Sequence, residues 1–309
     1  MIGTVYLNPT IDKTIYLERL QVGGTNRPTK VVVDGAGKAV NVAMVLSALG
    51  AKIKCIGYVY DQDSQVLLDR LAHGKIANEF LVRKGASRTN VKIFDEEKRE
   101  ITEINESGQS IDAKFMDQIT QLVQKYAGQF PYMVFAGSLP PGAPKSLYRD
   151  LIQLASQQGT RCILDAEGEA LELGLAAKPY LIKPNIDELN MLLGTEVKEI
   201  PEILKACRQI IQGGVSVVAV SMGGKGALIC DAQEAYQAQP LSVEVRSTVG
   251  AGDSMVAGMV YGFQQGGGIE EALRIGVACA SGSITLEGTQ LVSREIFEEL
   301  YPQIKIQKI

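Results

Sequence analysis

The chain has 309 residues, of which 46% are apolar, and this composition is sufficient to bury one large core. Its formal charge is -4, with 35 acidic and 31 basic residues, so composition gives no electrostatic reason to expect nucleic acid or an anionic membrane as the main partner. No stretch approaches the roughly 18 apolar residues of a membrane span, and the N-terminus turns polar too soon for a signal peptide. We therefore expect one domain over residues 1–309 and a cytoplasmic location.

The cysteines and the single histidine predict no metal centre. The cysteines are scattered without Cys-x-x-Cys spacing, which favours reduced, mostly buried thiols over a zinc site or a disulfide framework. They are Cys55, Cys162, Cys207, Cys230 and Cys279. His73 is the only histidine and follows a helical segment, so we expect it to interact with the carbonyl groups at a helix end.

Short runs rich in β-branched residues alternate with longer amphipathic segments, a pattern typical of βαβ units around a mainly parallel sheet. A helix is expected over Ala39–Leu49, stopped by Gly50, and a second lies between Ile111 and Tyr126, where apolar residues fall at helical spacings. In chain order, the expected strands are Gly3–Leu7, Ile53–Val59, Tyr132–Ala136, Cys162–Asp165, Tyr180–Ile182 and Val215–Ser221. Together these elements predict an α/β fold.

Two regions, Lys13–Asp34 and Asn90–Asn105, break this alternation. The second indicates two strands joined by a charged turn, and neither region has a helix to cover it. We interpret them as a small separate sheet, a lid formed by about residues 13–34 and 88–106, which could close on a substrate or pair with another subunit. An ordinary solvated hairpin is the alternative.

The first glycine cluster, VDGAGKAVNVAMVLSALG over residues 33–50, leads into a helix. Val40 stands where a dinucleotide fingerprint needs a small residue, and no acidic residue follows at the required distance, so a nicotinamide-binding fold is disfavoured. The chain also lacks the GxxxxGK[ST] element of a P-loop kinase. Lys38 and Asn41 could hydrogen-bond a hydroxylated ligand; the alternative is a tight turn with a surface lysine.

Three polar segments, GSLPPG, KPNIDE and SMGGKGA, follow predicted strands at the end where open α/β sheets bind ligands. Asn185 and Glu188 are three residues apart and could hold water around Mg²⁺, although Asn185 could equally cap a helix. The glycines at 223, 224 and 226 fit a hairpin-like turn whose backbone could run close to a nucleotide, and a plain hairpin is the alternative.

The strongest local signal is STVGAGDSMVAGMVYGF, residues 247–263, in which a glycine-rich turn leads directly into an apolar helix. Residues 250–252 could present free N–H groups at the positive end of that helix, which is an arrangement suited to phosphate. A carboxylate at position 253 would repel phosphate, so Asp253 makes more sense as the acceptor of a proton from an attacking hydroxyl. Simple helix capping is the alternative.

Taken in order, these segments resemble the ribokinase-like sugar kinases, specifically their phosphofructokinase B branch. The matching motifs are LNPTIDKTI, GAGKAVNVA, GSLPPGAP, KPNIDEL and TVGAGDSMVAG, and the GAGD core of the last is the most specific signature of the family. The resemblance covers nearly the whole chain. It implies a ribokinase-like three-layer α/β/α domain with a mainly parallel central sheet and a small β-sheet lid, and a homodimer formed through that lid.

The resemblance also implies a role for each matching residue. Asp253 corresponds to the catalytic base, and the backbone anion hole corresponds to Gly250, Ala251 and Gly252. Contacts with the sugar and its phosphate correspond to Asp12, Arg27, Gly37, Lys38, Asn41, Arg88 and Ser138. ATP, as co-substrate, corresponds to Lys183, Asn185, Ser221, Gly223 and Gly226. The metal is Mg²⁺, held through water by Asn185 and Glu188.

Within the branch, GDSMVAG and the EGEAL stretch at 167–171 are most similar to enzymes that phosphorylate fructose 1-phosphate to fructose 1,6-bisphosphate. Kinases of the same branch acting on tagatose 6-phosphate or fructose 6-phosphate are the alternatives, and a sensor that kept the pocket without the chemistry is an alternative of another class. Two departures bear on sugar preference. Glu167 stands where a small hydroxyl residue is common, and the usual GGKG-type loop becomes GAGKA.

Overall fold

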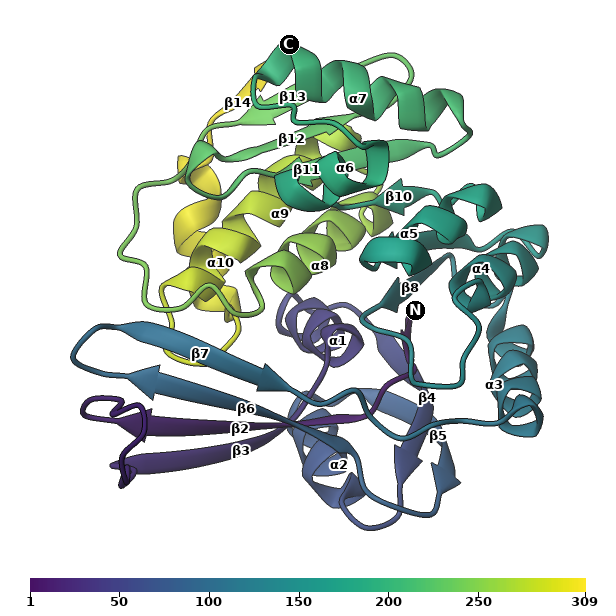
Figure 1. The fold of residues 1–309 in the computed structure, drawn as a ribbon. Helices are drawn as coiled ribbons and strands as arrows, with labels where there is room; N and C mark the ends of the chain where they lie inside the picture. Colours follow the sequence, from purple (N-terminus) through teal and green to yellow (C-terminus); the bar gives the residue numbers. More distant parts are fainter.

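The computed structural model describes residues 1–309, and its central element is a ten-stranded sheet. Seven neighbouring strands are parallel: β1 (Ile2–Tyr6), β4 (Ile53–Tyr60), β5 (Ala77–Arg83), β8 (Tyr132–Ala136), β9 (Arg161–Asp165), β10 (Leu181–Ile182) and β11 (Val217–Ser221). Three antiparallel strands extend one edge: β12 (Ala227–Cys230), β13 (Ala235–Ala238) and β14 (Ile306–Lys308). The order is β14-β13-β12-β11-β10-β9-β8-β1-β4-β5 (Figure 1).

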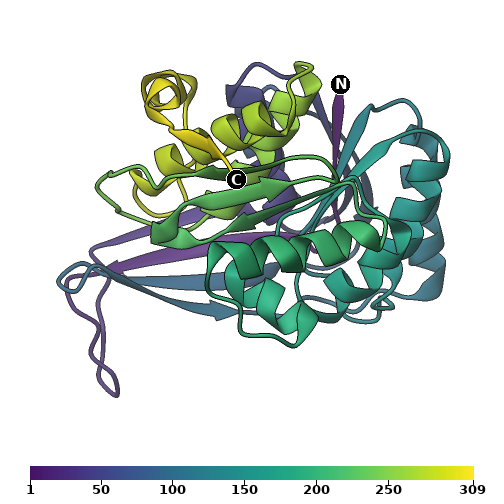
Figure 2. The same cartoon turned by 90° about the horizontal axis from the view of Figure 1, so that it is seen from above.

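Helices cover both faces of this sheet (Figure 2). One face carries α1 (Lys38–Ala48), α2 (Ser64–His73), α8 (Ala251–Gln264), α9 (Ile269–Ile284) and α10 (Arg294–Leu300). The other carries α3 (Ala113–Tyr126), α4 (Leu147–Gln157), α5 (Gly168–Gly174), α6 (Ile186–Leu193) and α7 (Ile200–Gln212). Every residue of β1 and β8 is therefore buried, which is why these strands are apolar except for Thr4.

A second, four-stranded sheet projects from this body (Figure 1). Its strands are β2 (Thr10–Leu17), β3 (Lys30–Ala36), β6 (Arg88–Asp95) and β7 (Glu100–Asn105), in the order β3-β2-β6-β7. The central pair, β2 and β6, is parallel, whereas each outer pair is an antiparallel hairpin. Figure 2 shows the segment between β2 and β3, in purple, extending beyond the end of the sheet.

The structure confirms the predicted fold class and the separate small sheet. Each predicted strand of the parallel sheet is present with its ends shifted by no more than two residues, and 223–226 joins two antiparallel strands as a hairpin. The five cysteines are free and buried, and the ring of His73 lies 2.8 Å from the carbonyl oxygen of Asp69 at the end of α2, both as expected. No helix has the length and apolar character needed to cross a membrane.

Candidate active site

The glycine-rich turn before α8 leaves backbone donors free at the start of a buried helix. Gly250 adopts the left-handed conformation, with φ of 76°, and the helix begins at Ala251. The N–H of Ala251 bonds to the carbonyl of Thr248 at 3.3 Å, whereas those of Gly250 and Gly252 have no hydrogen-bond partner in the protein. Two of the three predicted anion-binding donors are thus available, and they lie at the positive end of the helix dipole.

Asp253 lies in the first turn of α8 and is only 6% exposed. Its Oδ2 accepts a hydrogen bond of 2.8 Å from Nδ2 of Asn41, which projects from α1. Burial raises the pKa of Asp253 to about 6, and Lys38, Asn41 and Lys183 oppose that rise. A carboxylate with this pKa is ionised at neutral pH. The pKa itself is close to the value at which a general base works best.

Two cavities meet at the GAGD turn. The first has a volume of about 390 Å³; Gly250 and Asp253 line it, together with most of the predicted sugar-binding residues, Asp12, Gly37, Lys38, Asn41, Arg88 and Ser138. The second has a volume of about 330 Å³; Ala251 and Gly252 line it, together with Ser221, Gly223 and Gly226. The first is lined mainly by polar residues, and half of the residues that line the second are hydrophobic. One turn of backbone therefore borders both compartments.

A buried carboxylate connects lysines from the two substrate regions. Asp165, at the end of β9, lies 3.5 Å from Nζ of Lys38 and 3.5 Å from Nζ of Lys183. Its side chain is 1% exposed, and the two lysines hold its pKa below the usual value despite that burial. Asp165 raises the pKa of Lys38 in return. A methyl group on Gly252 would lie 3.4 Å from Lys183 Nζ, so this lysine reaches the glycine-rich turn before α8.

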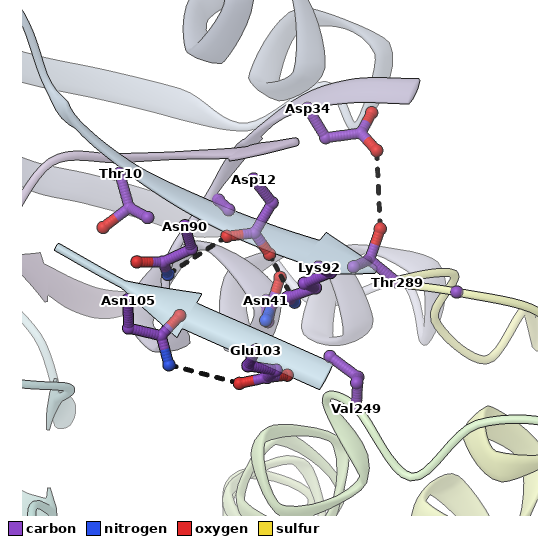
Figure 3. Close-up of polar contacts among 12 residues, drawn as sticks. Thr10, Asp12, Asp34, Asn41, Asn90, Lys92, Glu103, Asn105, Val249 and Thr289 are labelled. Atoms are coloured by element: carbon purple, nitrogen blue, oxygen red, sulfur yellow. Dashed lines mark hydrogen bonds and ion pairs between the residues drawn. The ribbon is translucent and has the colours of Figure 1, made fainter. Parts of the chain in front are cut away.

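The lid sheet contributes a polar wall to the first cavity (Figure 3). Asp12 on β2 pairs with Nζ of Lys92 at 2.6 Å and accepts from Nδ2 of Asn90 at 3.2 Å, both from β6. Glu103 and Asn105 on β7 continue the wall and bond to each other at 3.2 Å. Asp12 and Lys92 are both buried, so the charge of each compensates that of the other.

Arg88 and Ser138 line the same cavity but are already partly engaged. Arg88 donates from Nε to Thr10 Oγ1 at 2.8 Å and from one terminal nitrogen to the carbonyl of Glu106 at 3.0 Å. Ser138 Oγ accepts from Asn8 Nδ2 at 3.1 Å. These bonds fix both side chains at the cavity wall, and the second terminal nitrogen of Arg88 remains available to an anion.

The predicted metal residues form a helix cap. Asn185 Oδ1 accepts from the N–H of Glu188 at 2.8 Å, and Glu188 Oε2 accepts from the N–H of Asn185 at 2.8 Å, so the two residues make a capping box at the start of α6. Neither lines either cavity. Only Oε1 of Glu188 is left as an oxygen without a protein partner, which suits a cation that keeps most of its water shell.

Arg27 is the one predicted sugar-phosphate residue that the structure places elsewhere. It is exposed, in the connection between β2 and β3, and lines a surface hollow with Glu18, Arg19 and Glu97 at the far end of the lid. The chain between these strands is polar and extends away from the body, so its own subunit does not bring Arg27 to Asp253. The structure of one chain therefore does not bring Arg27 together with the other predicted sugar-phosphate residues, and its role stays a prediction.

Several residues at the site were absent from the sequence prediction. Arg88, Asn90 and Lys92 alternate along β6, and residues i, i+2 and i+4 of a strand share one face, so this spacing was a usable signal for Asn90 and Lys92. Asp165 ends a predicted strand, at the edge where open α/β sheets bind ligands, and this position was a usable signal for it. Its two lysine partners, Lys38 and Lys183, could not be predicted, because only folding brings them close to it.

A family model described as "pfkB family carbohydrate kinase" matches residues 6–296. This match spans most of the chain. The chain therefore belongs to the pfkB family of carbohydrate kinases. The 1-phosphofructokinase of Bacillus subtilis is 33% identical to this kinase, over 100% of both chains. The 1-phosphofructokinase of Escherichia coli K12 is 31% identical, over 99% of this kinase and 98% of its own chain.

Solved structures of phosphofructokinases resemble this kinase over its full length. The phosphofructokinase-2 of Escherichia coli in complex with substrates and products has a TM-score of 0.93 at 32% identity, covering 98% of both chains. A possible 1-phosphofructokinase of Thermotoga maritima has a TM-score of 0.90 at 25% identity, covering 100% of this chain and 99% of its own. The predicted family and the predicted ribokinase-like fold are confirmed.

Proposed function

We propose that this kinase transfers the γ-phosphoryl group of ATP to fructose 1-phosphate and releases fructose 1,6-bisphosphate and ADP. The observation that carries the proposal is the position of Asp253, a buried carboxylate at the border of a polar and a more apolar cavity, next to free backbone N–H groups. The similarity to relatives named 1-phosphofructokinase favours fructose 1-phosphate, rather than another sugar phosphate, as the proposed substrate.

In the proposed reaction, Asp253 accepts the proton of the free primary hydroxyl of the sugar. The hydroxyl oxygen forms a bond to the γ-phosphorus as the bond from that phosphorus to the bridging oxygen of ATP breaks, and ADP leaves with the electron pair. The N–H groups of Gly250 and Gly252 and the ammonium of Lys183 lie where they can stabilise charge on the transferring oxygens. Asp253 then returns its proton to solvent.

Binding of the two substrates divides between the two cavities. The sugar phosphate occupies the polar one, where Lys38 and Arg88 supply positive charge and Asp12, Asn41 and Ser138 supply hydrogen-bonding groups. ATP occupies the cavity beside Ser221, Gly223 and Gly226, whose apolar lining suits a nucleobase. Gly223 and Gly226 lack side chains that would separate the nucleotide from the backbone.

Mg²⁺ belongs to this proposal as a partner of the nucleotide. Glu188, with one free carboxylate oxygen, and Asn185 beside it would hold the ion through water, which fits a cation bound mainly by phosphates and water. When bound, the ion supplies charge neutralisation on the phosphate oxygens. Lys183 lies two residues before this pair and reaches the GAGD turn.

The lid would close over the sugar and exclude water, which otherwise competes as acceptor. Its outer surface exposes Val31, Val33 and Ile104, and these apolar side chains support a homodimer formed through the lid. In such a dimer, Arg27 of one subunit would contact the sugar phosphate bound by the partner subunit. We also propose a cytoplasmic location, with which five free cysteines agree.

The test is to present fructose 1-phosphate, fructose 6-phosphate and tagatose 6-phosphate separately with Mg·ATP and to rank kcat/KM. We expect fructose 1-phosphate to rank first. A higher kcat/KM for either 6-phosphate would assign the kinase to that sugar instead. Saturable binding of a sugar phosphate with no release of ADP would show a sensor rather than an enzyme.

A further inference from the structure

Helix α2 brings one charged side chain to the back of the active site without exposing it to the sugar cavity. Arg70 donates a hydrogen bond of 3.2 Å to Oδ1 of Asn41 and another to the carbonyl oxygen of Gly35 at the end of β3. Asn41 lines the sugar cavity, whereas Arg70 does not. Arg70 therefore contacts the proposed base through one intermediate residue.

The chemistry of the two contacts determines the orientation of the Asn41 amide. A guanidinium has five N–H donors and no acceptor, so the atom of Asn41 that faces Arg70 must be the oxygen. The opposite end of the amide is then the NH₂ group, and this is the end that lies 2.8 Å from Oδ2 of Asp253. The donor count of arginine alone is sufficient to fix this orientation.

We propose that Arg70 is a positioning residue, which holds the Asn41 amide with its nitrogen toward Asp253 and so keeps that carboxylate ready to accept a proton. The inference rests on the proposed role of Asp253 as the base. It adds a residue from α2 to a site that is otherwise built from the two glycine-rich turns, the lid and the ends of the parallel strands.

The reverse orientation of Asn41 would disable the base. With its oxygen toward Asp253, the amide would repel an ionised carboxylate and would instead accept a hydrogen bond from a protonated one, which cannot take another proton. The charged groups that face Asp253 from other elements are Lys38, Lys183 and Asp165. None of them contacts the Asn41 amide, so Arg70 is the only group besides Asp253 itself that distinguishes its two ends.

The packing of α2 against β3 explains how Arg70 is held in place. A methyl group on Gly35 would lie 2.5 Å from Cα of Leu67, so the strand and the helix approach each other too closely for any side chain at that position. Arg70 lies about one helical turn after Leu67, and its hydrogen bond to the carbonyl oxygen of Gly35 adds a second contact between the helix and the strand. A purely structural role for Arg70 would act through this second bond and through the attraction between its guanidinium and the Asp34 carboxylate on β3.

A double-mutant cycle distinguishes the positioning role of Arg70 from a purely structural role. The variants are Arg70→Met, which keeps much of the apolar stem, Asn41→Ala, and both together, with Arg161→Met as a matched control. Arg161 donates to the Tyr132 hydroxyl at 3.0 Å at the start of β9, away from both cavities. For each variant, kcat and kcat/KM would be measured between pH 5 and 9, alongside thermal unfolding.

We expect Arg70→Met to lower kcat about tenfold, the usual cost of a lost hydrogen bond to a charged group, and to move the acidic limb of the pH profile upward. In the Asn41→Ala background, Arg70→Met should lower kcat and shift the pH profile much less than in the parent background, because only the long-range attraction between Arg70 and Asp253 is then lost. Arg161→Met should match the parent protein in both. Arg70→Lys keeps a donor and should recover part of the loss; if Arg70→Met does not fold, Arg70→Leu, which also lacks a donor, replaces it in the cycle.

An equal loss from Arg70→Met in both backgrounds, or a loss of thermal stability with an unshifted pH profile, would overturn the positioning role. The same experiment should include Asp253→Asn. If Asp253→Asn is inactive while Arg70→Met leaves the pH profile unchanged, only the inference about Arg70 fails. If Asp253→Asn keeps normal turnover, the proposed base fails as well.

Discussion

Two glycine-rich turns, one before α1 and one before α8, border the sugar cavity, and they place opposite charges at the starts of their helices. Gly37 precedes Lys38, and Gly250 opens the turn that carries Asp253. A cation is unfavourable at a helix N-terminus and an anion is favourable there. Local helix electrostatics would therefore disfavour the charged form of Lys38 and favour that of Asp253.

The surroundings reverse both expectations. Asp165 holds Lys38 in its charged form and raises its pKa, whereas burial raises the pKa of Asp253 to about 6. One turn thus carries a permanent charge, suited to a phosphate, and the other carries a group that can exchange a proton near neutral pH. The function of a charged residue at either helix start therefore depends more on its buried neighbours than on the helix.

The largest expected effect comes from removing the proton acceptor. Asp253→Asn should lower kcat by about a hundredfold or more, the usual size of a lost general base, because an amide cannot take the hydroxyl proton. Binding of the sugar phosphate, measured by calorimetry, should survive. Near-normal turnover by this variant would remove the distinction between the two turns, since Asp253 would then act only as a helix cap.

A second effect separates the backbones of the two turns. Gly37 has φ of 122° and ψ of 147°, a conformation almost confined to glycine, and a methyl group there would lie 2.7 Å from the Tyr6 ring. That ring is held by hydrogen bonds of 2.7 Å to Ala36 and from Thr10. Gly250 has φ of 76°, and its methyl group would meet only the end of the Leu291 side chain.

We therefore expect Gly37→Ala to lower the free energy of unfolding by about 3 kcal/mol and Gly250→Ala by about 1 kcal/mol. Urea denaturation of the two variants and the parent protein checks the difference. Gly159→Ala is the matched control for a positive φ alone, because a methyl group at that exposed position meets nothing within 4 Å. Equal losses at positions 37 and 250 would contradict the steric argument.

The smallest effect is a shift in pH dependence. Activity should fall as the pH drops below about 6, because Asp253 must be deprotonated to act as the base. Lys38 makes the largest contribution that lowers the pKa of Asp253, so Lys38→Met should raise that pKa and move the acidic limb of kcat/KM to higher pH. Lys145→Met, at an exposed lysine outside both cavities, should leave the limb unchanged. A limb that stays in place in Lys38→Met would show that the two turns are not electrically coupled.

Much of the fold could be predicted from local pattern. Buried parallel strands are mainly apolar, and Gly50 marks the end of the first helix, so six of the seven parallel strands and α1 were placed to within two residues. The strands β5, β13 and β14 were missed. β5 lies at one edge of the sheet with no fully buried residue, so it lacks the apolar run of the central strands, and β13 and β14 have only four and three residues near the other edge, which is too little pattern to be distinguished from loop.

The candidate site divides in the same way. Asp253, Lys38 and the glycines around them form continuous motifs, so their residue types and spacing alone indicate a phosphate-binding turn and a nearby proton acceptor. Arg70 carries no motif, and the strand positions of Asp165 and Lys92 do not show which partners they have. They act through partners that folding brings close, such as Arg70 with Asn41 and Lys92 with Asp12, and a charge has no defined role until burial and a partner give it one. Sequence therefore predicted the proposed reacting groups, and packing determined which side chains contact them and shift their pKa values.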